Sequence, residues 1–354
     1  MAEGEPGLRD SFSSKFGVIA AAAGSAIGLG NIWRFPYVAG QNGGAVFLII
    51  YLLFIAAIGI PVMMSEFVIG RSAQRNPVGA FKLIAPGKKW YFVGLLGVVS
   101  AFIILAFYTV VAGWTLEYLV QSVKWMATSG RIGFSQMDNA ALKEFFTGHY
   151  QGFIDGKWRP ILWFVVMMFF TGYIVISGVK NGIEKYAKIL MPVLFLLLIV
   201  LVVRSVTLEG AGEGLLFLFR PDFSQLVHAP VRIIIEALGQ AFFSLSIGMG
   251  TLITYGSYIQ KKENLAGTAV NVAAADTFIA VVAGMAIFPA VFAFGIDPGE
   301  GPELVYITLP AIFQRMPGGL IWAFMFFLLL CFAALTSTIS VLEVIVAYFS
   351  EQLS

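Results

Sequence analysis

Eight stretches of this chain are apolar over a length that can cross a bilayer, and this feature limits the fold more than any other. A spanning helix needs roughly 20 mostly apolar residues, and only helices or closed barrels satisfy the backbone hydrogen bonds inside a membrane. Hydrophobic residues make up 59% of the chain and charged residues 12%, whereas soluble domains carry about 25% charged residues. We therefore predict an all-α integral membrane protein. The eight stretches run over residues 14–38, 43–70, 90–122, 160–177, 184–206, 231–259, 267–295 and 318–349.

Lysine and arginine gather in the connections that follow the second, fourth and sixth stretches. In membrane proteins, short basic connections of this kind face the cytoplasm. If successive spans cross the membrane in alternating directions, these three connections lie on the same side of it. With eight spans, both termini lie on that side too. We therefore predict a multi-pass protein of the cell inner (plasma) membrane with cytoplasmic termini. The basic residues are Arg71, Arg75, Lys82, Lys88, Lys89, Lys180, Lys185, Lys188, Lys261 and Lys262.

Two of the apolar stretches are interrupted by clustered glycines. The first interruption runs from Gly24 to Asn31 and the second from Phe243 to Gly250. Glycine is a poor helix former, so we expect each helix to unwind there. Backbone groups freed inside a membrane need a polar partner. Two broken helices at corresponding positions of two repeats indicate the ion and substrate site of a transporter.

The sequence lacks the features of an enzyme or of a nucleic-acid-binding protein. Its single cysteine, Cys331, excludes an intramolecular disulfide and a cysteine-built zinc site. No nucleophile–base pair or metal-ligand spacing stands out, and both histidines, His149 and His228, fall in predicted outer loops. The net charge of +2 comes without a basic patch interleaved with aromatic residues, which argues against a nucleic-acid partner. We predict that the protein is not an enzyme and uses no organic cofactor.

Several short motifs occur in one order across nearly the whole chain. The most extended is GSAIGLGNIWRFP, over residues 24–36. Together the motifs resemble the signature of the neurotransmitter:sodium symporter family. The resemblance implies the LeuT-type inverted-repeat fold, in which helices 1 and 6 are broken. The other motifs occupy residues 42–44, 113–116, 182–185, 239–246 and 333–337.

The resemblance also implies a division of the chain into repeats. The family has two inverted five-helix repeats, and this chain ends at Ser354, after the third helix of the second repeat. We therefore expect a shortened chain with eight spans present and helices nine and ten missing. The expected parts are a cytoplasmic segment (1–13) with an inner-gate arginine, a first repeat (14–206) with a long outer loop (123–159), an outer loop (207–230), and a partial second repeat (231–354) with helices 6–8 and an outer loop (297–316).

The first of two sodium sites implied by the resemblance lies between the broken helices. Sodium prefers several hard oxygen ligands, as calcium and magnesium do. Asp276 stands where the family usually has asparagine, and an acid inside a span is a functional candidate because its charge is expensive to bury. Its charge would balance sodium and make chloride dispensable; a protonated aspartate bonded to backbone is the alternative. The implied ligands are the Ala26 carbonyl, the side chains of Asn31 and Asp276, Ser244, and the substrate carboxylate.

The second implied sodium site joins the first broken helix to the stretch 318–349. Its side-chain ligands would be the hydroxyls of the consecutive residues Thr336 and Ser337, and its carbonyl ligands those of Gly24, Ile27 and Ala333. Hydroxyls of this kind also commonly bond to the preceding turn of their own helix or link neighbouring helices. That ordinary structural role is the alternative interpretation.

Gly28 indicates the class of substrate. Monoamine-transporting relatives carry an aspartate at this position, whereas glycine leaves room for the carboxylate of an amino acid. Amides near Leu29 and Gly30 and the hydroxyl of Tyr108 could bind that carboxylate. The other end of the implied pocket is apolar, so we expect several neutral, hydrophobic L-amino acids to be accepted. The pocket residues would be Ala26, Gly28, Leu29, Gly30, Ile104, Tyr108, Phe243, Ser244, Ser246, Met249, Ser337 and Val341.

Gates on both sides of the pocket follow from the same resemblance. Arg34 would close the outer side, with Phe243 as an aromatic lid. The family pairs this arginine with an aspartate on helix ten, so we expect the outer gate to be incomplete here. The inner gate would be an ion pair of Arg9 and Glu351, braced by Ser257 and Tyr258.

Together these features predict a sodium-coupled symporter for neutral, hydrophobic L-amino acids that works by alternating access and without chloride. Its partners would be the amino acid, two sodium ions and the lipid bilayer, while the oligomeric state is left open. A receptor or channel-like protein of the same fold, without coupled transport, is the alternative. Sodium-dependent accumulation of a tracer against its gradient would separate the two.

Overall fold

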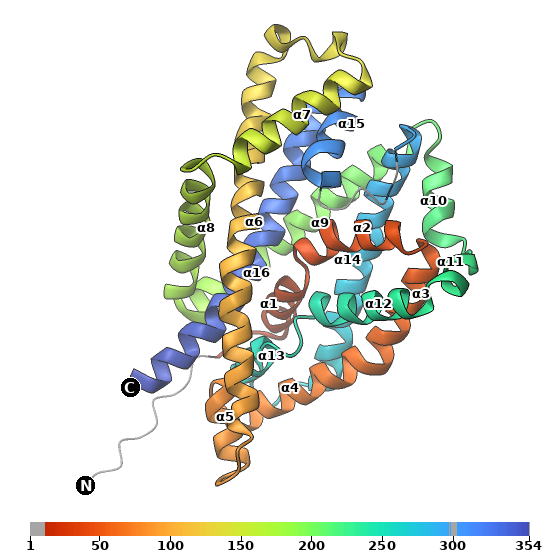
Figure 1. The fold of residues 1–354 in the computed structure, drawn as a ribbon. Coiled ribbons are helices and arrows are strands. Elements are labelled where there is room, and N and C mark those ends of the chain that lie inside the picture. Colours follow the sequence, from red (N-terminus) through yellow and green to blue (C-terminus); the bar gives the residue numbers. More distant parts are fainter. Residues whose placement is uncertain (1–10, 297, 299–302, 354) are drawn as a thin grey trace.

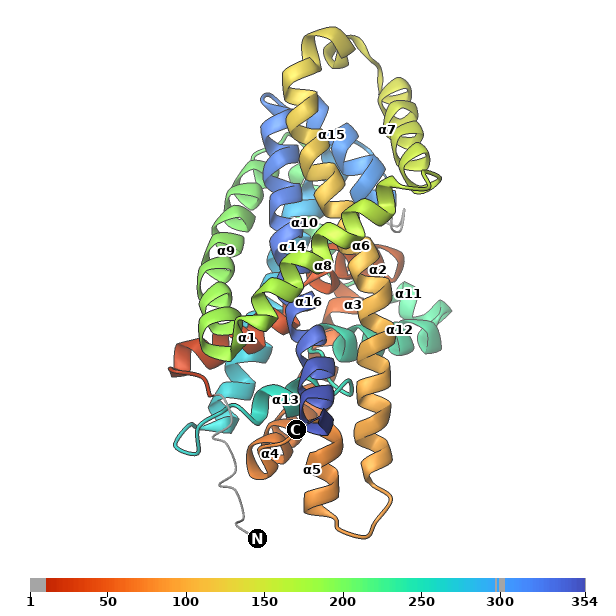
Figure 2. The same cartoon turned by 90° about the vertical axis from the view of Figure 1, so that its left-hand side faces the viewer.

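The computed structural model describes residues 11–296, 298 and 303–353, and helices are the only regular secondary structure in this part of the chain. They form an elongated bundle (Figure 1). The helix α6 (Tyr91–Ile132) runs along nearly its whole length in both views (Figures 1 and 2). Helices α7 (Asn139–Ile154) and α15 (Leu309–Arg315) lie at one end, and α5 (Pro77–Ile84) lies at the other, near the C-terminus.

Within the described ranges, six helices or continuous helix pairs are long and apolar enough to cross a membrane. They correspond to the predicted stretches two to five, seven and eight. Two of them are joined without a break from shorter helical segments, and each of these two contains a π-helix. The six are α3 (Ala45–Phe54) with η2 (Ile55–Gly59) and α4 (Ile60–Ala73); α6; α8 (Arg159–Ile176); η4 (Val179–Glu184) with α9 (Lys185–Val206); α14 (Leu265–Ala293); and α16 (Gly319–Leu353).

The two remaining stretches are the ones interrupted by glycines, and both are broken. The first consists of α1 (Lys15–Ala26) followed by η1 (Gly30–Arg34) and α2 (Phe35–Gln41), with a bend of 49° between the two parts. The second consists of α12 (Pro230–Ser244) and α13 (Thr251–Gly256), separated by six residues outside any helix. The predicted interruption of both helices is therefore present in the structure.

The predicted outer loops are largely helical. The stretch expected to end at residue 122 continues to Ile132, so α6 has 42 residues. At 1.5 Å per residue such a helix is roughly 60 Å long, about twice the thickness of the hydrocarbon core, so it extends beyond the membrane. The other helices in these loops are η3 (Phe134–Gln136), α7, α10 (Ala211–Phe219), α11 (Ser224–His228), η5 (Leu304–Thr308) and α15.

Helix starts follow ordinary capping chemistry. The side chain of Ser14 accepts a hydrogen bond from the Gly17 amide at the start of α1. Asn76, followed by a proline, caps α5, and Asn264 caps α14 in the same way. Side chains of this kind satisfy backbone amides that have no partner within the helix. Each of these starts is therefore encoded locally.

The first broken helix lies at the centre of the bundle. Helix α1 packs against α9, α13, α14 and α16, and α16 in turn packs along α6. Helix α8 instead turns large apolar side chains outward, among them Leu162 and Phe169, which are 56% and 68% exposed. An apolar surface of this kind suits lipid rather than water. Helix α1, at whose end the break lies, is consequently surrounded by other helices.

Candidate functional site

The break in the first helix brings its backbone against α6 and α16. Helix α1 ends at Ala26, and Ile27 is extended, with φ −77° and ψ 97°. At Gly28 a Cβ atom would lie 2.3 Å from Ser337 Oγ and 2.6 Å from the Tyr108 hydroxyl oxygen. Both distances are far below van der Waals contact. A residue other than glycine would therefore displace one of these two hydroxyl groups.

The break in the second helix contains three residues in the left-handed region of backbone space. Ser246, Gly248 and Gly250 have φ values of 53°, 86° and 80°. Such values end a right-handed helix and are rare for residues other than glycine. The Gly248 amide, freed by the break, donates to Glu66 Oε1 on α4 at 2.7 Å. Glu66 was not predicted as a site residue, although it is an acid inside a predicted span, as Asp276 is.

Asp276 lies fully buried on α14, where the two broken helices meet. Its Oδ1 accepts from Asn31 Nδ2 at 2.7 Å, and its Oδ2 accepts from Ser244 Oγ at 2.6 Å and from the Tyr51 hydroxyl at 3.2 Å. Three of the four residues predicted for the first sodium site are thus joined by direct hydrogen bonds. Tyr51 was not predicted, because a tyrosine in an apolar stretch gives no signal of its own.

Asn31 presents its amide nitrogen, not its oxygen, to the Asp276 carboxylate. Its Oδ1 instead accepts from the Gly28 amide at 3.3 Å. A carboxylate accepts hydrogen bonds but cannot donate them, so this orientation of the amide follows from its neighbour. For Asn31 to offer oxygen to a cation beside Asp276, its side chain has to turn.

The residues predicted for the second sodium site lie across the contact between α1 and α16. Thr336 Oγ1 donates to the carbonyls of Phe332 and Ala333 in its own helix, each at 3.1 Å. Ser337 Oγ reaches across to the Ser25 carbonyl on α1 at 3.3 Å. The ordinary structural role considered for these hydroxyls is therefore present in the structure: one bonds within its helix and the other links two helices.

A small cavity lies between the two breaks, α6 and α16. Ten of the twelve residues predicted for the substrate pocket line it. The other two are not among the lining residues: the Leu29 amide donates to the Tyr108 hydroxyl at 2.9 Å, and Ser244 binds Asp276. The free volume is about 20 Å³, room for about one water molecule. The lining residues are Ser25, which was not predicted, with Ala26, Gly28, Gly30, Ile104, Tyr108, Phe243, Ser246, Met249, Ser337 and Val341.

Arg34 lies above the cavity and has partners on α12. Its guanidinium donates to Gln240 Oε1, and its Nη2 lies 3.3 Å from Glu236 Oε2. It also lies 5.6 Å from the centre of the Phe243 ring. The family resemblance placed the partner of Arg34 on a tenth helix; in this chain the partners come from the broken helix beside it. Neither Glu236 nor Gln240 was predicted.

A family model described as "Sodium:neurotransmitter symporter family" matches residues 9–354. The chain belongs to the sodium:neurotransmitter symporter family. It is 43% identical to the uncharacterized sodium-dependent transporter YhdH of Bacillus subtilis, over 95% of this chain and 71% of that protein. It is 39% identical to an uncharacterized sodium-dependent transporter of Haemophilus influenzae, over 98% of this chain and 75% of that one.

Among solved structures, the chain is similar to MhsT in complex with L-phenylalanine. The TM-score is 0.87 and the identity 50%, over 98% of this chain and 75% of MhsT. The predicted LeuT-type fold is confirmed by this similarity. The symporter is a sodium-dependent membrane transporter, as its family and its relatives are, and not an enzyme.

The predicted inner gate of the symporter is only partly within the described residues. Arg9 lies outside them. Glu351 accepts hydrogen bonds from the backbone amide and the side chain of Asn76, at 2.8 and 2.6 Å. Ser257 donates to the Thr254 carbonyl, and Tyr258 to the Glu343 carboxylate, each at 2.5 Å. Each described residue of this gate is thus anchored to α5 or α16, or within its own turn.

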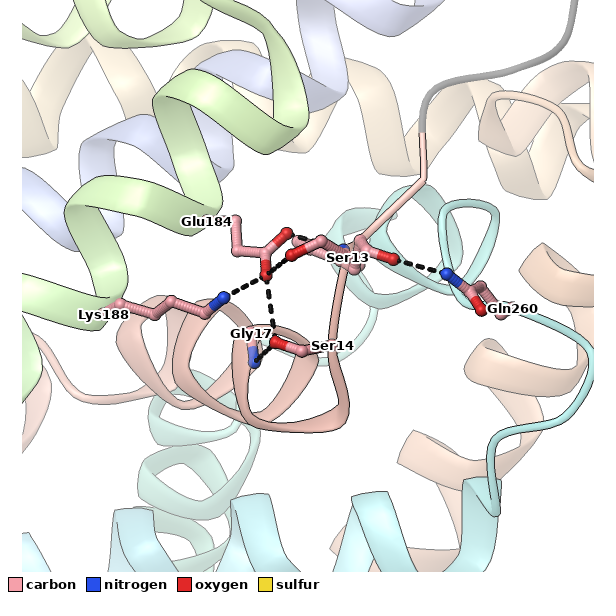
Figure 3. A network of polar contacts seen from close by, with 7 residues as sticks. Ser13, Ser14, Gly17, Glu184, Lys188 and Gln260 are labelled. Carbon is pink, nitrogen blue, oxygen red and sulfur yellow. Dashed lines mark hydrogen bonds and ion pairs between the residues drawn. The ribbon is translucent and has the colours of Figure 1, made fainter.

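A second polar network holds the segment just before α1 (Figure 3). Glu184 is buried and accepts from the Ser13 amide at 2.7 Å, from Ser13 Oγ at 2.6 Å and from Lys188. On the other side of the segment, Gln260 Nε2 donates to the Phe12 carbonyl at 2.8 Å. The segment before α1 is therefore held between the end of η4 and the residues that follow α13. The sequence placed Glu184 in a family motif but gave it no role.

Proposed function

We propose that the chain carries neutral, hydrophobic L-amino acids together with sodium, and does so without chloride. The observation that carries this proposal is the packing at Gly28. A side chain at this position would overlap the hydroxyl groups of Ser337 and Tyr108. Because no acidic side chain fits there, the carboxylate at this end of the cavity has to come from the substrate. An amino acid supplies one, whereas a simple amine does not.

The lining of the cavity supports an apolar substrate side chain. Ile104, Phe243, Met249 and Val341 line it, and none of them carries a charge or a hydrogen-bonding group. Methionine adapts to different shapes, and apolar pockets distinguish one methylene group by only about 1–3 kcal/mol. We therefore expect several hydrophobic amino acids to be accepted. The similarity to MhsT, whose structure holds L-phenylalanine, agrees with this class.

The cavity has to widen before it can hold any amino acid, because its free volume is about 20 Å³. From the second broken helix, Phe243 lines the cavity near the end of α12, and Ser246 and Met249 line it from within the break at residues 245–250. Substrate would bind the widened state and shift the population toward it. Movement of the two broken helices against α6 and α16 is the expected form of alternating access.

Two sodium sites are proposed from the residues that meet at the breaks. The first comprises Ala26, Asn31, Ser244 and Asp276, and the substrate carboxylate would complete it. The second comprises Gly24, Ile27, Ala333, Thr336 and Ser337, across the contact of α1 with α16. Because the substrate would be a ligand of the first ion, sodium and substrate would raise each other's affinity by the same factor.

Independence of chloride is proposed from Asp276. Its carboxylate receives hydrogen bonds from three side chains, at the point where the two broken helices meet. A negative charge built into the protein at this position would balance the first sodium ion. The proposed topology places the connections that carry Arg71, Lys180 and Lys261 in the cytoplasm, so that the inward sodium gradient drives uptake.

Binding of labelled amino acids to the purified chain tests the proposal. We expect leucine and tryptophan to bind in sodium but not in potassium, equally well with chloride or gluconate as the anion. Stronger binding of glycine would contradict the proposed apolar pocket, and binding that ignores sodium would contradict the coupling. Accumulation of the same label in proteoliposomes against its gradient would separate a symporter from a receptor or channel of the same fold.

A further inference from the structure

One face of α12 gathers three side chains around the guanidinium of Arg34. Glu236, Gln240 and Phe243 are spaced four and three residues apart, so they lie on the same side of the helix. Glu236 Oε2 is 3.3 Å from Arg34 Nη2, Gln240 accepts from Nη1, and the Phe243 ring lies 5.6 Å from Cζ. A single helix thus supplies a carboxylate, an amide oxygen and an aromatic face to one cation.

The same face of α12 closes one side of the cavity. Gly30 and Phe243 both line the cavity. Gln240 Nε2 donates to the Gly30 carbonyl at 2.9 Å, and a Cβ on Gly30 would lie 2.9 Å from the Phe243 ring. Arg34 lies one turn further along η1 from Gly30. The cavity cannot open between η1 and α12 unless the contacts of Arg34 with α12 also break.

We propose that Glu236 is a positioning residue of the outer gate, whose carboxylate holds Arg34 over Phe243 and thereby favours the closed state of the cavity. The inference rests on the proposed function, because a gate has a role only if the substrate enters this cavity. Glu236 touches neither the cavity nor the residues proposed as sodium ligands, so its effect would pass through Arg34.

The alternative interpretation is that Arg34 and Glu236 form a surface ion pair that does not affect opening of the cavity. The side chains of Arg34 and Glu236 are 25% and 40% exposed, and pairs of this kind typically change an equilibrium by about two- to fivefold. Most such pairs join groups that stay together in every state of a protein. Arg34 and Glu236 instead lie on the two elements that have to separate. Breaking this pair would therefore change the ratio of closed to open states by the full two- to fivefold.

The first test measures the release of bound substrate. Labelled leucine is bound to the full chain in sodium, and its dissociation is followed after dilution into unlabelled leucine. We expect Glu236→Gln to release the label about two- to fivefold faster than the unaltered chain. Glu213→Gln is the matched control, since Glu213 is exposed on α10, away from the cavity. Equal release rates for Glu236→Gln and Glu213→Gln would overturn the proposal.

The second test needs no substrate. A cysteine replaces Ile104 in the cavity wall, in a Cys331→Ala background that removes the native thiol, and its rate of labelling by a maleimide reports opening. Adding Glu236→Gln should speed the labelling. An unchanged rate, in a chain that still binds leucine in sodium, refutes the gate and leaves the proposed function intact. Faster labelling, together with no amino-acid binding by the chain that keeps Ile104, refutes the proposed function and leaves the gate intact.

Exchange of the two charges separates a specific pair from general damage to the protein. Arg34→Glu and Glu236→Arg should each speed the labelling of the cysteine. In the double variant the carboxylate and the guanidinium face each other again, so the rate should return toward that of the unaltered chain. Additive effects of the two single changes would show that the pair is not coupled, and the proposal would fail.

Discussion

The side-chain amide of Asn31 on η1 donates a hydrogen bond of 2.7 Å to the carboxylate of Asp276 on α14, so residues 245 positions apart meet at the break of the first helix. Both side chains are fully buried. A buried carboxylate is stable only with partners, and Asn31, Ser244 and Tyr51 supply them. A cation entering beside Asp276 would compete with these donors for the same oxygens.

Removing the charge of Asp276 is expected to weaken sodium binding. Asp276→Asn keeps the size of the side chain but removes the negative charge proposed to balance the ion. The apparent sodium affinity, measured by sodium titration of leucine binding, should fall about tenfold or more. Added chloride should restore part of it, because an anion could occupy the vacated place. Asp222→Asn is the control, since Asp222 is exposed between α10 and α11. An unchanged sodium titration in Asp276→Asn would remove its proposed role.

A methyl group at Gly28 is expected to abolish amino-acid binding. In Gly28→Ala the new Cβ would lie 2.3 Å from Ser337 Oγ and 2.6 Å from the Tyr108 hydroxyl oxygen. One of these groups then has to move into a cavity with only about 20 Å³ free. Gly239→Ala on α12 is the matched control, because nothing lies within 4 Å of its Cβ position. Equilibrium binding of leucine measures the effect, and undiminished binding by Gly28→Ala would contradict the proposed pocket.

The Glu184 network is expected to stabilise the folded protein. Glu184→Gln removes a carboxylate that accepts from Ser13 and Lys188 (Figure 3). Loss of charge-assisted hydrogen bonds to a buried group should lower the free energy of unfolding by about 1–3 kcal/mol. The midpoint of thermal unfolding in detergent measures this, with Glu144→Gln, an exposed residue of α7, as the control. The segment before α1 should also become easier to cleave by protease; equal midpoints and cleavage rates would exclude this role.

His149 is expected to make the protein less stable in acid. Burial lowers the pKa of His149 below its ordinary value of 6.5, while Glu117, 3.7 Å away, raises it and Arg159 and Lys124 lower it further. The unfolded chain therefore takes up a proton near pH 6.5 that the folded protein takes up only at lower pH. The free energy of unfolding consequently falls as the pH drops from 6.5 toward the folded-state pKa, whereas above 6.5 this group has no effect.

A variant without the imidazole tests this pH dependence. In His149→Gln the loss of unfolding midpoint between pH 7.5 and pH 5 should be smaller than in the unaltered chain. His228→Gln is the control, because His228 is exposed on the short helix α11. Parallel pH profiles for the unaltered chain and His149→Gln would show that His149 does not contribute.

The sequence by itself determined the class of fold and the family. Apolar stretches of spanning length have to form helices inside a bilayer, because their backbone hydrogen bonds find no other partners there. The glycines at residues 24–30 and 248–250 mark where two of those helices break. These are local properties, so they can be read without knowing which helices touch. The helical nature of the outer loops was underestimated, because α7, α10 and α15 are short or flanked by polar residues and carry no spanning signal.

Only the tertiary structure decided which side chains meet at the breaks. Tyr51 and Glu66 lie on the predicted span 43–70, yet their contacts with Asp276 and Gly248 depend on how α3 and α4 pack against the broken helices. The pairing of Arg34 with Glu236 likewise depends on the placement of η1 beside α12. The periodicity of a helix predicts which residues share one of its faces. Which other helix packs against that face depends on segments far apart in the chain.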